Sequence, residues 1–112
     1  MTPALRTLQG DSDSLRILDL GAGEGYVGER MQQVFEADVV LADIVPMNRT
    51  TLSHVIYDGS TLPWPDDDFD VTVLYFVLHH CADPERVVQE AQRVSRQGVV
   101  VVESTFSQLW QR

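Results

Sequence analysis

Lysine is absent from this 112-residue sequence, whose 8 basic residues are all arginines, set against 17 aspartates and glutamates. The formal net charge at pH 7 is therefore −9. A surface that follows the phosphates of a nucleic acid needs clustered basic side chains, whereas these arginines are scattered along the chain. The composition argues against a nucleic-acid partner.

Cysteine and long apolar runs are also scarce. Cys81 is the single cysteine, so the chain forms no internal disulfide and offers no pair of thiolates for zinc. No run approaches the roughly 18 to 20 apolar residues of a membrane-spanning helix. The first ten residues lack the apolar stretch of a signal peptide. We therefore expect no metal and no membrane, and a cytoplasmic protein.

Apolar runs alternate with stretches of helical spacing. Five short apolar runs are typical of buried strands, and they cover residues 15–20, 38–43, 53–57, 70–76 and 98–103. Helical spacing covers residues 26–35, and Asp83-Pro84 opens a second helix that reaches residue 94. This order predicts an α/β fold, a Rossmann-like parallel sheet of order 3-2-1-4-5 with helices on both faces. We expect a single domain over residues 1–112, with its core at 15–104.

A glycine-rich loop, Asp19-Leu-Gly-Ala-Gly-Glu-Gly25, joins the first strand to the first helix. Ligands of open parallel sheets bind beyond the carboxyl ends of the strands, and glycine lets the backbone approach them closely. Gly23-Glu-Gly-Tyr-Val-Gly28 has the G-x-G-x-x-G spacing of dinucleotide loops, which alone is a weak signal. The register fails, because a count from Gly21 puts the third glycine position on Tyr26.

Two acids near this loop narrow the ligand further. Asp19 would repel a pyrophosphate and attract an ammonium group. Asp43 ends the next strand, at about the distance along the chain expected of a ribose-binding acid. The predicted ligand carries an amino group, a carboxylate and a nucleoside but no phosphate, and S-adenosylmethionine fits that description.

Four stretches, in order, resemble the motifs of class I S-adenosylmethionine-dependent methyltransferases. They are residues 17–25, 40–43, 58–70 and 77–84. The resemblance covers residues 15–104 and is closest to the small-molecule type that includes ubiquinone and menaquinone methylases. It implies S-adenosylmethionine as cofactor and methyl transfer to a small-molecule acceptor.

The resemblance also implies a cofactor site. Its predicted residues are Asp19, Gly21, Ala22, Gly23, Gly25, Asp43, Ile44, Asp58, Gly59 and Tyr75. Asp19 and the glycines would line the methionine part, Asp43 would hold the ribose hydroxyls, and Asp58 would accept from the adenine amino group. No residue is assigned to catalysis, because a sulfonium methyl group is already activated and the protein mainly has to position the reactants.

Other side chains have a functional and a structural interpretation. One histidine of the pair His79-His80 could act as a general base, although packing explains the pair as well. Adjacent side chains point in different directions, so at most one faces a given site. The acidic run 66–68 is typical of a solvated loop rather than a metal site. Trp64 is expected to plug a loop, and Cys81 to be a small buried hydrophobe.

The C-terminal end departs from the family's pattern, in which a helix and an antiparallel strand pair follow the fifth strand. We expect those antiparallel strands to be lacking, which leaves the edge of the fifth strand open. The chain is then either truncated or a homo-oligomer that covers this edge. Two alternatives to an active methyltransferase stay open. One is a non-catalytic S-adenosylmethionine-binding fragment or subunit that needs a partner chain, and the more distant one is a nicotinamide-dependent reductase.

Overall fold

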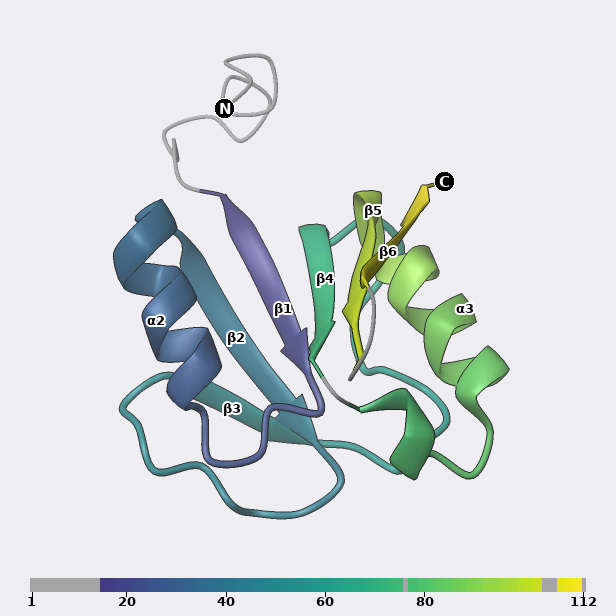
Figure 1. Cartoon of the computed structure of the whole chain (residues 1–112), viewed down its shortest axis with the longest axis horizontal. Coiled ribbons are helices and arrows are strands. Elements are labelled where there is room, and N and C mark those ends of the chain that lie inside the picture. Colours follow the sequence, from purple (N-terminus) through teal and green to yellow (C-terminus); the bar gives the residue numbers. More distant parts are fainter. Residues whose placement is uncertain (1–14, 76, 104–106, 112) are drawn as a thin grey trace.

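A computed structural model describes residues 15–75, 77–103 and 107–111, with only the backbone for the last segment (Figure 1). Along the chain the elements are β1 (Arg16–Leu20), α2 (Tyr26–Phe35), β2 (Asp38–Asp43), β3 (Ser53–Ile56), β4 (Phe69–Tyr75), the short 3₁₀ helix η1 (Leu78–His80), α3 (Pro84–Val94), β5 (Ser95–Val102) and β6 (Ser107–Gln111). Phe76, predicted to end the fourth strand, lies outside the described residues.

The strands form one six-stranded sheet of order β3-β2-β1-β4-β5-β6. β1 lies at its centre and pairs in parallel with β2 and with β4. The outer pairs β2–β3 and β4–β5 are parallel as well. The predicted parallel sheet of order 3-2-1-4-5 is confirmed.

Alternate residues of β1 pack on opposite faces of the sheet. Leu18 belongs to a core cluster that includes Val87 and Ala91 of α3. Its neighbour Ile17 belongs to a second cluster, against which Met31 of α2 packs. Because successive side chains of a strand point to opposite faces, the two helices cover opposite faces, as predicted (Figure 1).

Both helices begin as the sequence indicates. Gly25, in the left-handed conformation at φ 96°, precedes the first residue of α2. Asp83 caps α3, because its side chain accepts from the backbone N–H of Arg86, and Pro84 occupies the first helical position. The predicted bounds of α2 and β2 agree with the structure to the residue.

The junction between α3 and β5 differs from the sequence interpretation, which left residues 95–97 between the predicted helix and the predicted fifth strand. The strand begins directly at Ser95, where the backbone is already extended at φ −110° and ψ 128°. Ser95 Oγ donates to the carbonyl oxygen of Ala91 and lies 2.6 Å from Thr72 Oγ1 of β4. These contacts occupy a carbonyl at the helix end and attach the junction to the sheet, so no turn is needed.

The predicted open edge at the fifth strand is wrong. β6 pairs antiparallel with β5, with Gly98 opposite Gln111 and Val102 opposite Ser107. One antiparallel strand is therefore present, where none was expected. Five residues suffice, because a short segment returning along β5 can pair with the exposed backbone groups of that edge. A homo-oligomer built on an open β5 edge loses its basis.

Across the described residues, the structure contains no helix with the length and apolar character needed to cross a membrane.

Candidate functional site

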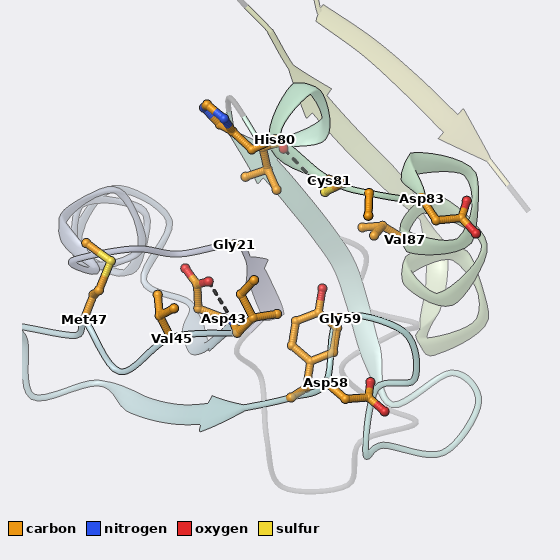
Figure 2. A pocket seen from close by; sticks show the side chains of 14 residues that line it. Gly21, Asp43, Val45, Met47, Asp58, Gly59, His80, Cys81, Asp83 and Val87 are labelled. Carbon is orange, nitrogen blue, oxygen red and sulfur yellow. Dashed lines mark hydrogen bonds between the residues drawn. The ribbon is translucent and has the colours of Figure 1, made fainter.

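A cavity of about 630 Å³ lies at the carboxyl edge of the parallel strands (Figure 2). Its wall is formed by the glycine loop, by the residues that follow β2 and β3, and by the segment from Val77 to Val87. Because all five parallel strands end at this edge, the chain segments that leave them converge there. The volume lies in the range of small-molecule sites.

The structure brings half of the predicted site residues to this wall. Those that line the cavity are Gly21, Asp43, Ile44, Asp58 and Gly59. Those that do not line it are Asp19, Ala22, Gly23, Gly25 and Tyr75. Three of the latter lie between β1 and α2, and Asp19 is the second-last residue of β1.

The glycine loop is held against the end of β2. The backbone N–H groups of Gly21 and Ala22 donate to the carbonyl oxygen of Ala42, at 2.7 and 3.1 Å. Gly21 has φ 79°, and a Cβ there would lie 2.6 Å from the side chain of Val77. Gly23 has φ 57°, and a Cβ there would meet nothing within 4 Å. The close contact with Val77 therefore requires glycine at position 21, and the positive φ angle favours glycine at position 23.

Asp43 is fixed by two backbone donors. Its Oδ2 accepts from the N–H of Gly23 at 2.7 Å, and its Oδ1 accepts from the N–H of Ile44 at 2.6 Å. Figure 2 shows this side chain at the cavity wall, near Gly21. A carboxylate oxygen has two lone pairs, so both oxygens can each accept one further hydrogen bond from a ligand hydroxyl.

Asp19 is buried behind the loop, with 2% of its surface exposed. Among the described residues, its Oδ2 atom has no hydrogen-bond partner. Burial, followed by the charge of Asp43, raises the pKa of Asp19 to about 7, against the opposing effect of the Gly28 backbone. Asp19 is therefore a buried carboxyl with one oxygen, Oδ2, unpaired among the described residues, and it lies near the acid that lines the cavity.

Asp58 lies at the cavity rim, at the turn that follows β3. Its Oδ1 accepts from the backbone N–H groups of Ser60 and Thr61, at 2.8 and 2.9 Å. These two bonds lower the pKa of Asp58, so the exposed carboxylate is ionised at neutral pH.

The electrostatic character of the wall follows from its side chains. It contains the carboxylates of Asp43, Asp58 and Asp83, and no arginine among the described residues lines it. Such a wall attracts a positively charged ligand and repels phosphate groups. The arrangement therefore disfavours a dinucleotide.

The two adjacent histidines have different surroundings. His80 lines the cavity and is exposed. His79 has its Nδ1 2.9 Å from Glu103 Oε1, and its ring centroid lies 4.0 Å from that of His80. The hydrogen bond from His79 lowers the pKa of Glu103. Only one member of the pair faces the site, as predicted.

The remaining singled-out side chains have structural roles. Trp64 packs edge-on against Phe69 in the core, which confirms the predicted loop plug. Asp66 pairs with Arg93, and Asp68 pairs with Arg16. Cys81 packs against the core as predicted, but it is only half-buried and also lines the cavity.

Tyr57 is a wall residue to which the sequence interpretation gave no role. It was read as the end of the third strand, whereas β3 ends at Ile56 and Tyr57 already belongs to the carboxyl edge. Its position next to Asp58 is the signal that could have identified it.

The sequence profile of the family described as "Methyltransferase domain" matches residues 18–102, which is most of the chain. The chain belongs to this methyltransferase domain family. S-adenosylmethionine is the methyl donor that the family implies.

Two curated relatives agree with this membership. The chain is 28% identical over 99 residues to a demethylmenaquinone methyltransferase of Paenarthrobacter aurescens (strain TC1), covering 82% of this chain and 39% of that protein. It is 27% identical over 115 residues to a ubiquinone/menaquinone biosynthesis C-methyltransferase of Shewanella sp. (strain ANA-3), covering 89% and 46%. The methyltransferase domain thus spans less than half of the length of these relatives.

The fold similarity extends to the YcgJ protein of Bacillus subtilis. The two structures share a TM-score of 0.72 at 22% identity, over 89% of this chain and 48% of that one. At this level of identity the likeness concerns the fold.

The residues present fit S-adenosylmethionine in three respects. The buried carboxyl of Asp19, whose Oδ2 has no partner among the described residues, suits a cationic ligand. Asp43 has remaining lone pairs at the wall for ribose hydroxyls. The described wall residues contain no arginine that would hold a phosphate, and the ligand carries none.

Proposed function

We propose that this methyltransferase domain binds S-adenosylmethionine in the cavity and takes part in methyl transfer to a small-molecule acceptor. One observation carries the proposal: the fixed Asp43 carboxylate, the glycine loop and Asp58 meet at one cavity whose described wall has no arginine. The names of the quinone-methylating relatives support a small-molecule acceptor.

The nucleoside half of the donor is assigned to the ends of β2 and β3. Asp43 accepts hydrogen bonds from the ribose hydroxyls, and the exposed side chain of Ile44 packs on the adenine. Asp58 accepts from the adenine amino group, and the backbone of Gly59 lies beside the ring edge. These roles are consistent with the convergence of the four residues on one wall.

The methionine half is assigned to the loop before α2. Asp19 balances the ammonium group, and the backbone of Gly21, Ala22, Gly23 and Gly25 lines the aliphatic part. Tyr75, which ends β4 and is 42% exposed, stays a prediction for contact with methionine and acceptor.

The donor supplies a methyl group on a positively charged sulfur. The task of the chain is to hold donor and acceptor in line, and positioning of this kind supplies up to about 7–11 kcal/mol in ideal cases. This division of labour explains why no catalytic triad is needed at the cavity.

Calorimetry with S-adenosylhomocysteine and with NADH tests the donor assignment. We expect a micromolar dissociation constant for S-adenosylhomocysteine and no binding of NADH. The variant Asp43→Asn should weaken binding about 10- to 100-fold, since hydrogen bonds to a charged group contribute about 1.5–3 kcal/mol.

Asp38→Asn is the matched control, because Asp38 lies at the opposite end of the same strand, β2, and is exposed. Its affinity should equal that of the unmodified chain. Binding of NADH alone would refute the donor assignment, as would equal losses for the two variants.

Transfer is separable from binding. Incubation with S-adenosylmethionine labelled in its methyl group, across a panel of hydroquinones and phenols, should label an acceptor. A chain that binds the donor tightly yet labels none would support the alternative of a non-catalytic binding module. The cytoplasmic location stays a prediction from the sequence.

A further inference from the structure

Tyr57 is held in a defined place relative to Asp43. Its backbone N–H donates to the backbone carbonyl oxygen of Asp43 at 3.0 Å, which continues the pairing of β2 with β3. Its half-buried ring packs against the main core cluster and forms part of the cavity wall. The sheet therefore places this ring beside the acid assigned to the ribose.

Packing explains the ring but not the hydroxyl. A phenylalanine would bury the same apolar surface, and among the described residues the Tyr57 hydroxyl makes no recorded hydrogen bond. The hydroxyl of a half-buried side chain on a cavity wall, with no partner from the described residues, is available to a ligand.

The surroundings of this hydroxyl keep it protonated. Burial, followed by the negative charges that Cys81, Asp43, Asp58 and Glu90 carry at high pH, raises the pKa of Tyr57 to about 12. The phenol therefore stays protonated at physiological pH, and its oxygen keeps a hydrogen to donate.

Donors are scarce among the other side chains of the wall. Asp43, Asp58 and Asp83 present carboxylate oxygens, which accept. The thiol of Cys81 is directed to the carbonyl oxygen of Val77 at 3.4 Å, and His80 is exposed. Tyr57 is thus the half-buried side chain with a hydrogen to give.

Adenine needs both kinds of group. Its exocyclic amine donates, which suits Asp58, whereas its ring nitrogens N1, N3 and N7 accept. We propose that Tyr57 determines the base specificity of the donor site by donating a hydrogen bond from its hydroxyl to a ring nitrogen of adenine. The proposal rests on the proposed function, since it assumes that the cavity holds the adenosyl group.

Calorimetry with S-adenosylhomocysteine and its 1-deaza, 3-deaza and 7-deaza analogues tests this contact. Tyr57→Phe removes only the hydroxyl. It should weaken the binding of S-adenosylhomocysteine about threefold to tenfold, the usual effect of one neutral hydrogen bond. Tyr26→Phe is the control, because Tyr26 is exposed on α2 and absent from the described wall, and it should bind like the unmodified chain.

The analogues identify the accepting nitrogen. One of them should bind the unmodified chain about threefold to tenfold more weakly than S-adenosylhomocysteine, yet bind Tyr57→Phe as tightly as S-adenosylhomocysteine does. Such non-additivity is the signature of a direct contact. If each of the three analogues loses affinity by the same factor in the unmodified chain and in Tyr57→Phe, the contact does not exist.

Spectroscopy gives a second readout. The chain has three tyrosines, so Cζ-labelled tyrosine gives three carbon signals, and the one lost in Tyr57→Phe belongs to Tyr57. S-adenosylhomocysteine should shift that signal more than the other two. An unmoved Tyr57 signal with bound ligand overturns the contact alone, whereas an unmodified chain that binds no S-adenosylhomocysteine overturns the proposed function.

Discussion

Asp19 and Asp43 are neighbouring acids in different states. Asp43 accepts two backbone hydrogen bonds at the cavity wall, while Asp19 is buried with one oxygen unpaired among the described residues. Burial of an unpaired charge is costly, and a carboxyl in this position binds a proton instead. At neutral pH Asp19 is therefore close to its point of half-protonation, with a pKa of about 7.

Replacing Asp19 tests the cost of its charge. A carboxyl whose pKa is raised by folding stabilises the folded state at low pH, where it is protonated. This contribution to the free energy of unfolding is lost as the pH rises through about 7. Asp19→Asn cannot ionise, so its stability relative to the unmodified chain should be greater at pH 8 than at pH 5. The two pH units between 5 and 7 correspond to about 2–3 kcal/mol.

Urea denaturation of both proteins at the two pH values measures this difference. A stability difference that is the same at pH 5 and pH 8 would show that Asp19 does not carry a raised pKa. Asp19→Asn should also weaken the binding of S-adenosylhomocysteine, because the ammonium group of the ligand loses its counter-charge.

At the residue scale, the sequence predicted the acids of the site better than its other groups. Asp43 ends β2 and Asp58 lies two residues beyond the end of β3, so the apolar runs placed both acids near the carboxyl edge. Tyr57 was missed because an aromatic residue at the end of an apolar run is indistinguishable from one more strand residue. The division of roles between His79 and His80 depends on Glu103, which is distant in sequence.

The helix α3 anchors the loop that carries Asp58. Glu90, buried on α3, accepts from the backbone N–H of Leu62 at 2.8 Å and from Arg93 Nε at 2.8 Å. Arg86 extends the contact, with its Nε donating to the carbonyl oxygen of Ser60 at 3.1 Å. The rim of the cavity is therefore attached to a helix on the far side of the loop.

Glu90→Gln tests this anchor. Hydrogen bonds from Arg93, and then from the Leu62 backbone, lower the pKa of Glu90. A lowered carboxyl pKa stabilises the folded state above the pKa of the unfolded chain and loses that contribution as the pH falls. The neutral variant should lose about 2 kcal/mol of unfolding free energy at pH 7, within the usual effect of hydrogen bonds to charged groups.

Glu85→Gln is the control on the same helix, since Glu85 is exposed in its first turn. Its urea midpoint should stay close to that of the unmodified chain. Equal midpoints for the two variants would mean that Glu90 does not anchor the loop.

At the element scale, local patterns located α2 and β2 to the residue. Helical spacing and continuous apolar runs are short-range signals, and here both are strong. The direct junction at Ser95 was missed because it depends on a contact with Thr72 in another strand. β6 was missed because its pairing with β5 depends on chain reversal rather than on a local pattern.

At the scale of the whole molecule, the candidate site lies at one edge of the sheet, the carboxyl ends of its parallel strands. All five parallel strands direct their carboxyl ends toward the edge of the sheet at which the cavity lies. Two helices on opposite faces bury the centre of the sheet (Figure 1). Within the described residues, β3 and β6 form the edges of the sheet. The net charge of −9 agrees with the acidic side chains of the wall, which attract cations and repel phosphate groups.

A crystal structure of the chain with S-adenosylhomocysteine tests the central claim most directly. The account predicts ligand density in the cavity, with a ribose hydroxyl oxygen about 2.5–3.0 Å from a carboxylate oxygen of Asp43. The adenine should lie beside Ile44 with its amino group toward Asp58. Density outside this cavity, or a ribose directed away from Asp43, would contradict the account.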